Sequence, residues 1–244
     1  MVRNIPQRLC LLCAILCSIV CVLVGCVRLL DMQQSREGKP MRYLALGDSY
    51  TIGESVTPTE RWPVQLAAQL HAHDLALADP LIIARTGWTT DELLAGIERQ
   101  TSQGPFDLVS LLIGVNNQYR GRSSEEYRTQ FQQLLHTAIT LAGGHPDHVI
   151  VLSIPDWGVT PFAAGRQRAT IAAAIDRFNA TNRAETLQAG ARYVDITPVS
   201  RQALHDATLI APDGLHPSGK MYTKWVELVL PTALAALGKG ATQD

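Results

Sequence analysis

A serine near the start of the chain and a histidine near its end have the residue types of a nucleophile and its base. Ser49 stands in the motif Gly-Asp-Ser-Tyr at 47–50, directly after an apolar run, so its hydroxyl can project from a strand end. A serine hydroxyl is too weakly acidic to attack an acyl group at neutral pH without an adjacent base. His216 is the candidate base, and Asp213, three residues earlier, can reach the far imidazole nitrogen and fix the ring's tautomer. These residues predict acyl transfer to Ser49, followed by attack of a water that the same histidine activates.

Two more polar blocks follow other apolar runs. Gly87 stands in Arg-Thr-Gly-Trp at 85–88, and Asn116 stands in Gly-Val-Asn-Asn at 114–117. Each block alone has an ordinary explanation, as a loop glycine or a helix cap. The same holds for Trp88, Gln118 and Tyr119, which either line a pocket or pack in the core or on the surface. The functional signal is the order of the blocks and their shared position after apolar runs.

The body of the chain alternates short apolar runs with longer amphipathic stretches. The runs that suit buried parallel strands are residues 42–46, 81–84, 108–113, 148–154 and 192–196. The stretches that suit helices are residues 62–73, 90–100, 124–141, 166–188 and 218–237, and Pro231 should bend or split the last. The alternation predicts one α/β domain with an open, doubly wound sheet. In such sheets, sites lie beyond the carboxyl ends of the strands.

Two of the predicted helices show an apolar face with helical spacing. In residues 124–141 the face is formed by Tyr127, Phe131, Leu134, Leu135 and Ala138. In residues 166–188 it is formed by Ile171, Ala174, Ile175, Phe178 and Leu187. Because such stripes usually face the core, we expect these side chains to be buried rather than to form a binding groove.

The N-terminus has the layout of a targeting segment. Two arginines precede residues 9–25, which carry no charge, and the sequence Leu-Val-Gly-Cys then ends at Cys26. This ending resembles the lipobox of bacterial lipoproteins, which implies cleavage before Cys26 and lipidation of that cysteine. The alternative is an uncleaved anchor helix. We therefore divide the chain into a signal peptide or anchor (1–25), a polar tether (26–40) and a domain (41–240) located outside the cytoplasm.

Composition excludes several other classes of protein. All five cysteines fall within the first 26 residues, so the body has no disulfide framework, zinc–cysteine site or cysteine nucleophile. The net charge of −1 and the lack of a basic run give no footprint for nucleic acid. Residues 214–220 have the glycine and lysine spacing of a phosphate loop, but Met221 follows where such a loop needs Ser or Thr. We expect no metal and no cofactor.

Together the four blocks resemble those of the SGNH (GDSL-type) hydrolases, in the same order and over nearly the whole body. Two positions differ from that family's usual pattern: Tyr50 replaces a commoner Leu, and Asn117 replaces an Asp. The resemblance implies a flavodoxin-like, three-layer fold with a five-stranded parallel sheet. It also implies a catalytic triad of Ser49, Asp213 and His216. The oxyanion hole would be formed by the backbone N–H groups of Ser49 and Gly87 and by the side-chain amide of Asn116.

The expected function is therefore that of a membrane-tethered serine esterase that needs no cofactor. Its substrate would be a small-molecule, lipid or carbohydrate ester. A short-chain or O-acetyl ester, a lysophospholipid and a thioester all stay open, because fold and triad do not choose among them. The alternative is a non-catalytic, tethered binding lipoprotein that retains the same fold. The presence of all five site residues favours the enzyme.

Overall fold

The strands form one parallel sheet. The computed structural model describes residues 39–100 and 104–239. The strand order is β2-β1-β3-β4-β5, with all neighbours parallel. The strands are β1 (Tyr43–Gly47), β2 (Leu81–Ala84), β3 (Leu108–Leu112), β4 (Val149–Leu152) and β5 (Arg192–Val194). This confirms the predicted α/β fold and its five strands, in the flavodoxin-like order.

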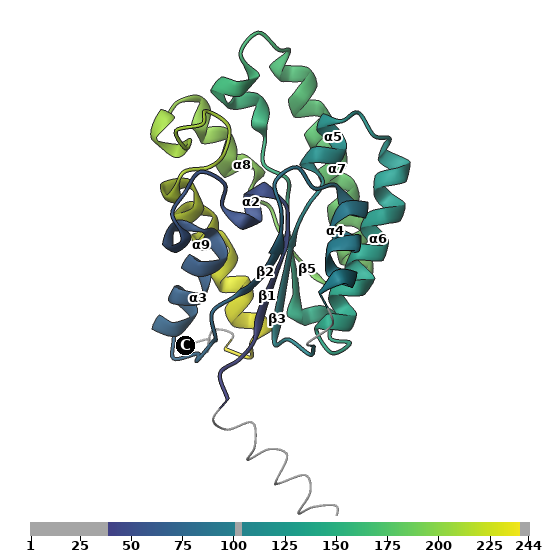
Figure 1. The fold of residues 1–244 in the computed structure, drawn as a ribbon, viewed down its shortest axis with the longest axis vertical. Coiled ribbons are helices and arrows are strands. Elements are labelled where there is room, and N and C mark those ends of the chain that lie inside the picture. Colours follow the sequence, from purple (N-terminus) through teal and green to yellow (C-terminus); the bar gives the residue numbers. More distant parts are fainter. Residues whose placement is uncertain (1–38, 101–103, 240–244) are drawn as a thin grey trace, which may run out of the picture. The chain divides into compact units, whose positions relative to one another are not determined.

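Helices cover both faces of the sheet (Figure 1). On one side lie α3 (Trp62–Ala72) and α9 (Gly219–Ala236), which pack against each other. On the other side lie α4 (Thr90–Arg99), α6 (Ser124–Leu141) and α7 (Arg168–Gln188), with α6 in contact with both of the others. All five correspond to predicted helices. The protein is thus a three-layer structure.

Pro231 was expected to bend or split the last helix, and of these two outcomes the split does not occur. Pro231 lies within the continuous helix Gly219–Ala236. A proline removes the hydrogen bond to the carbonyl four residues earlier, here that of Glu227. Both residues are exposed, so water can satisfy the freed carbonyl. The helix therefore tolerates the proline on its solvent side.

Short helices escape sequence analysis because they bury no periodic stripe. They are α2 (Ser49–Ile52), α5 (Val115–Tyr119) and α8 (Thr197–Ser200). The 3₁₀ turns are η1 (Pro58–Glu60), η2 (Pro146–His148), η3 (Trp157–Val159), η4 (Pro161–Ala163), η5 (Arg201–Leu204) and η6 (Ala207–Leu209). Figure 1 shows α2, α5 and the segment before α7 gathered at one end of the sheet. This is the end where a site is expected.

The predicted apolar faces are buried with two exceptions. All five stripe residues of α6 are buried, as are Ile171, Ile175 and Phe178 of α7. Ala174 is only partly buried. Leu187 is 55% exposed although its neighbours Glu185 and Thr186 are buried, so it lies on the solvent-facing side of α7. The prediction for Leu187 was wrong.

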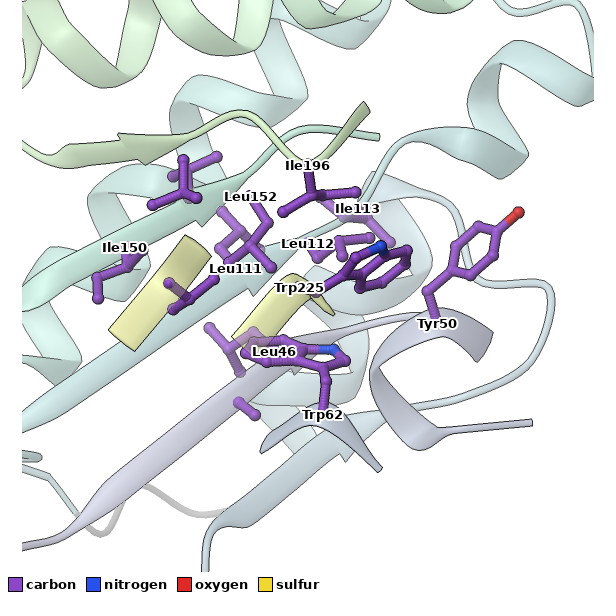
Figure 2. Close-up of a cluster of buried hydrophobic side chains, with 14 of the residues drawn as sticks. Leu46, Tyr50, Trp62, Leu111, Leu112, Ile113, Ile150, Leu152, Ile196 and Trp225 are labelled. Carbon is purple, nitrogen blue, oxygen red and sulfur yellow. The ribbon is translucent and has the colours of Figure 1, made fainter. Parts of the chain in front are cut away.

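Buried aliphatic and aromatic side chains support the end of the sheet that carries the polar blocks (Figure 2). Leu46, Leu111, Leu112 and Leu152 come from three adjacent strands and have no exposed surface. The fully buried indole of Trp225 of α9 lies against them, and next to it stands Tyr50, with its hydroxyl turned away from the aliphatic cluster. The strand ends thus rest on a tightly packed base.

Among residues 39–100 and 104–239, no helix is long and apolar enough to span a bilayer. Cys26, the signal segment 1–25 and nearly all of the tether lie outside the described residues.

Candidate active site

A cleft beyond the strand ends brings together residues from all four predicted blocks, including the one near the C-terminus. It has a volume of about 160 Å³. Ser49, Gly87, Asn116 and His216 all line it. The remaining lining residues are mostly apolar or aromatic: Tyr50, Thr86, Val115, Tyr119, Trp157, Phe162 and Leu215. Residues far apart in sequence therefore meet in one place.

The serine sits at the start of a very short helix whose geometry depends on its neighbours. Asp48 caps α2 by accepting a hydrogen bond from the Tyr50 N–H at 3.0 Å. A side chain at Gly47 would place Cβ 2.2 Å from Thr51 Oγ1 and 2.4 Å from the Leu112 carbonyl, so only glycine fits there. The turn is thus fixed on both sides of Ser49, whose residue surface is 5% exposed.

Asp48 itself is fully buried, and its Oδ2 has no hydrogen-bond partner among the described residues. Burial raises its pKa from 3.8 to about 7, against the opposing effect of the Tyr50 N–H bond. Its place in the structure fits the role of ordering the nucleophile turn.

Asp48→Asn should remove a pH dependence of stability. Since the folded-state pKa is raised, the native chain binds more protons than the unfolded chain between pH 3.8 and about 7. The wild-type free energy of unfolding should therefore fall as the pH rises through that window, and Asp48→Asn should not show this loss. Denaturant unfolding at several pH values measures the difference, with the exposed Asp79→Asn as control. Parallel curves for wild type and Asp48→Asn would refute the prediction.

The histidine and aspartate are joined directly. His216 Nδ1 lies 2.6 Å from Asp213 Oδ2. Asp213 Oδ1 accepts the backbone N–H groups of Leu215 and His216, each at 2.9 Å. Partial burial alone would raise the Asp213 pKa, but hydrogen bonds, first that of Ser55 and then that of His216, outweigh it and hold the pKa well below its usual value. Asp213 therefore stays ionised and binds Nδ1 of His216. The other ring nitrogen, Nε2, is the one that can act as a base.

Ser55 is a residue of this site that sequence analysis missed. Its hydroxyl donates a hydrogen bond to Asp213 Oδ2 at 2.6 Å, across 158 positions of sequence. Its backbone lies in the left-handed region, with φ of 64°, which is uncommon for a residue other than glycine. No local motif signals such a long-range contact.

Ser49 and His216 line the same cleft, but no hydrogen bond joins them in this structure. Bonds between a nucleophile and its base are often longer before substrate binds. The Tyr50 ring packs edge-on against the His216 imidazole, with centroids 5.7 Å apart. Burial raises the Tyr50 pKa, so its phenol stays neutral. The base is therefore held from one side by a carboxylate and from another by an aromatic ring.

Three of the residues that line the cleft, Ser49, Gly87 and Asn116, carry N–H groups of the kind that can bind an oxyanion. The backbone N–H groups of Ser49 and Gly87 donate no hydrogen bond to any described residue. Gly87 has φ of 84°, a conformation that glycine adopts readily. Asn116 Nδ2 donates one hydrogen to the Trp88 carbonyl at 2.9 Å and keeps a second, because an amide nitrogen carries two. The donors are present, each with hydrogen-bonding capacity to spare.

The unusual Asn117 has a different role from its neighbour. It is fully buried, its Oδ1 accepts the Thr90 N–H at 3.1 Å and its Nδ2 donates to Thr90 Oγ1 at 2.7 Å. The Thr90 hydroxyl in turn donates to Gln130 Oε1. The amide thus completes a directed chain of hydrogen bonds at the start of α4 and ties it to α5, the helix that carries Asn116.

Asn117→Ala and Asn116→Ala should separate stability from catalysis. We expect Asn117→Ala to lower the free energy of unfolding by about 2–4 kcal/mol, because the buried Thr90 N–H loses its partner. Asn116→Ala should change stability little and lower kcat by about 10²–10³-fold, as loss of an oxyanion donor does. Denaturant unfolding and ester hydrolysis of both variants give the comparison. Equal stability of the two variants would contradict it.

The sequence left open whether Trp88, Gln118 and Tyr119 line a pocket or pack elsewhere, and the structure places them differently. Tyr119 lines the cleft. Gln118 does not, but its Oε1 accepts the indole N–H of Trp157 at 2.8 Å. The Trp88 ring lies directly over Gly96 of α4. Within the part of the chain that the structure describes, no group of three or more His, Cys, Asp or Glu is placed to hold a metal ion.

Comparison with known proteins agrees with this geometry. The sequence model of the "GDSL-like Lipase/Acylhydrolase family" matches residues 45–224. The lipase/acylhydrolase from Enterococcus faecalis has a similar structure, with a TM-score of 0.63 and 18% identity, over 84% of this chain and 99% of that chain. Axe2, an acetylxylan esterase from Geobacillus stearothermophilus, gives 0.60 and 19%, over 84% and 99%. The esterase EstA from Pseudoalteromonas sp. gives 0.60 and 16%, over 81% and 98%. No curated protein sequence matches significantly.

The fold and the family match together define a hydrolase that acts on carboxylic ester bonds. The chain belongs to the GDSL-like lipase/acylhydrolase family.

Proposed function

We propose that the protein is a serine esterase that works through an acyl-enzyme intermediate on Ser49, with His216 as base and Asp213 as its orienting carboxylate. The observation that carries the proposal is the meeting of Ser49, Gly87, Asn116 and His216 in one cleft, with Asp213 bonded to the far side of the histidine ring. Each group is of the type that acyl transfer requires.

The proposed reaction has two halves. Ser49 Oγ attacks the ester carbonyl carbon while His216 takes the hydroxyl proton, and the N–H groups of Ser49, Gly87 and Asn116 stabilise the oxyanion. The intermediate collapses as His216 gives the proton to the departing alcohol. Water, deprotonated by His216, then attacks the acyl-enzyme, and Ser49 leaves with that proton. Asp213 stabilises the imidazolium in both halves.

The cleft favours a small acyl group. Its volume of about 160 Å³ and its mostly apolar lining suit a short acyl chain better than a long one. Axe2, with a similar fold, is named an acetylxylan esterase, which is consistent with a short-chain acyl or O-acetyl ester here.

We also propose that the domain is tethered to a membrane outside the cytoplasm through a lipidated Cys26. The support is the sequence pattern at 1–26 alone. Mass spectrometry of the mature N-terminus tests it: an acylated Cys26 as first residue is expected. An intact segment 1–25 would instead indicate the anchor helix.

Covalent labelling tests the proposed mechanism. A fluorophosphonate should label the full-length chain once, and peptide mapping should place the label on Ser49, because only an activated serine reacts. The structure of EstA, which is described as inhibited by monoethylphosphonate, makes this probe class suitable. A folded protein that is not labelled would favour the binding-protein alternative, and a label on another serine would refute Ser49 as nucleophile.

A further inference from the structure

One wall of the cleft consists of three aromatic side chains in mutual contact. Tyr119 ends α5, Trp157 begins η3 and Phe162 lies in η4, and all three line the cleft. Their ring centroids are 5.4 Å (Tyr119–Trp157), 6.0 Å (Trp157–Phe162) and 6.2 Å (Tyr119–Phe162) apart. We call these three residues the aromatic wall.

Hydrogen bonds fix the aromatic wall to the catalytic elements. The Trp157 indole N–H donates to Gln118 Oε1 at 2.8 Å, on the helix that carries Asn116. The Phe162 backbone N–H donates to the Gly214 carbonyl at 2.9 Å, in the loop that carries His216. The wall is therefore preformed at the reacting centre, so that little ordering is needed when substrate binds.

Two of the three rings are unusually exposed. Tyr119 is 46% exposed and Phe162 is 42% exposed, whereas Trp157 is 4% exposed. Aromatic side chains that stay exposed beside a cleft lose the free energy that burial would give, and a bound substrate can cover them. This points to a substrate surface rather than to a purely structural cluster.

The guanidinium of Arg166 lies close to all three rings of the aromatic wall. The Arg166 guanidinium carbon lies 5.4 Å from the ring centroid of Tyr119, 5.3 Å from that of Trp157 and 5.4 Å from that of Phe162. Its one hydrogen bond to a described side chain goes to the Tyr119 hydroxyl, at 3.3 Å. A guanidinium has five N–H donors, so most of them are free. Among the described residues, no carboxylate forms an ion pair with Arg166.

Two carboxylates just outside the cleft, those of Glu54 and Asp213, already accept hydrogen bonds from other residues. No Asp or Glu is among the lining residues. Asp213 lies behind His216, where its oxygens already accept hydrogen bonds from Ser55, Leu215 and His216. Because most of the Arg166 N–H donors are free, its planar guanidinium can bind a carboxylate or a phosphate, whose geometry it matches.

We propose that Arg166 and the aromatic wall form a recognition site for an anionic group, a carboxylate or a phosphate, that the substrate carries near its scissile ester. The rings hold the apolar body next to that group, and Arg166 binds the oxyanion. The proposal rests on the proposed function and narrows its substrate class to anionic esters.

Substrate pairs that differ only in charge test the proposal. For the alcohol half, we compare 4-acetoxybenzoate with 4-acetoxybenzamide, and 4-acetoxyphenyl phosphate as a phosphate in the same position. For the acyl half, we compare mono(4-nitrophenyl) adipate with its methyl ester. The wild-type full-length chain should show a higher kcat/KM for the anionic member of at least one pair, mainly through a lower KM. The substrate with the highest preference shows whether the site binds a carboxylate or a phosphate. It also shows whether that group belongs to the alcohol half or to the acyl half of the ester.

Variants of two neighbouring arginines assign the preference. In Arg166→Gln, the anionic-to-neutral ratio of kcat/KM should fall about tenfold or more, the size of a charge-assisted hydrogen bond. Arg166→Lys should keep part of the preference. Arg168→Gln removes another exposed cation, which lies over none of the three rings, and should leave the ratio unchanged. A wild type without charge preference, or equal effects of Arg166→Gln on both members, would overturn the inference.

Ser49→Ala on every substrate keeps this inference separate from the proposed function. If hydrolysis depends on Ser49 but not on charge, the recognition site is refuted and the esterase stands. If no hydrolysis depends on Ser49, calorimetric titration with 4-hydroxybenzoate and 4-hydroxybenzamide still decides. Tighter binding of the carboxylate that is lost in Arg166→Gln supports the site, and equal binding of both compounds refutes it.

Discussion

Ser49→Ala is expected to lower kcat for ester hydrolysis by about 10⁴-fold or more, the loss that follows removal of a nucleophilic serine. The effect should be this large because no other described serine lines the cleft. Stability should be nearly unchanged, since no hydrogen bond of the described structure depends on the Ser49 hydroxyl. Hydrolysis of 4-nitrophenyl acetate, butyrate and octanoate, beside thermal unfolding, measures both properties.

The matched control is Ser124→Ala, the same chemical change at an exposed position in the first turn of α6. It should keep full activity. If Ser49→Ala retained wild-type activity, the nucleophile would have to be sought elsewhere. If it lost activity together with its fold, unfolding curves would reveal this.

Asp213→Asn is expected to lower kcat by about 10³–10⁴-fold with a small change in KM. The carboxylate now accepts the Nδ1–H of His216 at 2.6 Å and stabilises the imidazolium. An asparagine amide can instead present N–H to that nitrogen, which favours the wrong tautomer and leaves no negative charge. Because the wild-type pKa of Asp213 is far below its usual value, its carboxylate is ionised throughout the neutral range, and the defect should persist there.

Asp206→Asn provides the control for this prediction. Asp206 also belongs to the segment between β5 and α9, but its carboxylate accepts hydrogen bonds from Lys220 and Thr208 at the surface and none from a described histidine. Its substitution should leave kcat unchanged. A rate in Asp213→Asn within about tenfold of wild type would show that His216 is oriented by other groups, such as the Tyr50 ring.

Sequence analysis predicted the parts of the fold that have a local pattern, and it proposed site residues from local motifs. Buried strands and amphipathic helices leave runs and stripes in the sequence, so β2 and α6 were predicted to their ends. Ser49, Asp213 and His216 stand in recognisable blocks, and the last two lie within one turn of each other.

The parts that were missed depend on contacts between distant segments. Ser55 donates a hydrogen bond to Asp213, which lies 158 positions later, and no local sequence pattern around Ser55 predicts that bond. Trp157 and Phe162 follow β4 in a segment without periodicity, and Arg166, expected in the next helix, lies just before it. Only the fold brings these three residues to Tyr119. The effect of Asn117 also required the structure, because its partner Thr90 belongs to a different block.

The hydrogen bond from the Phe162 N–H to the Gly214 carbonyl links the segment that shapes the substrate cleft to the loop that carries His216. Engineering the substrate range of this protein therefore also affects its turnover. Gly214 has φ of 73°, and a side chain there would contact the Pro161 ring at 3.5 Å, so the two loops are fitted to each other. Lengthening or reshaping the segment between β4 and α7 to admit a new substrate would pull on the turn between Asp213 and His216. A change in substrate range is therefore expected to change turnover as well. A change of preference that starts in the aromatic wall would need a compensating change in the histidine loop.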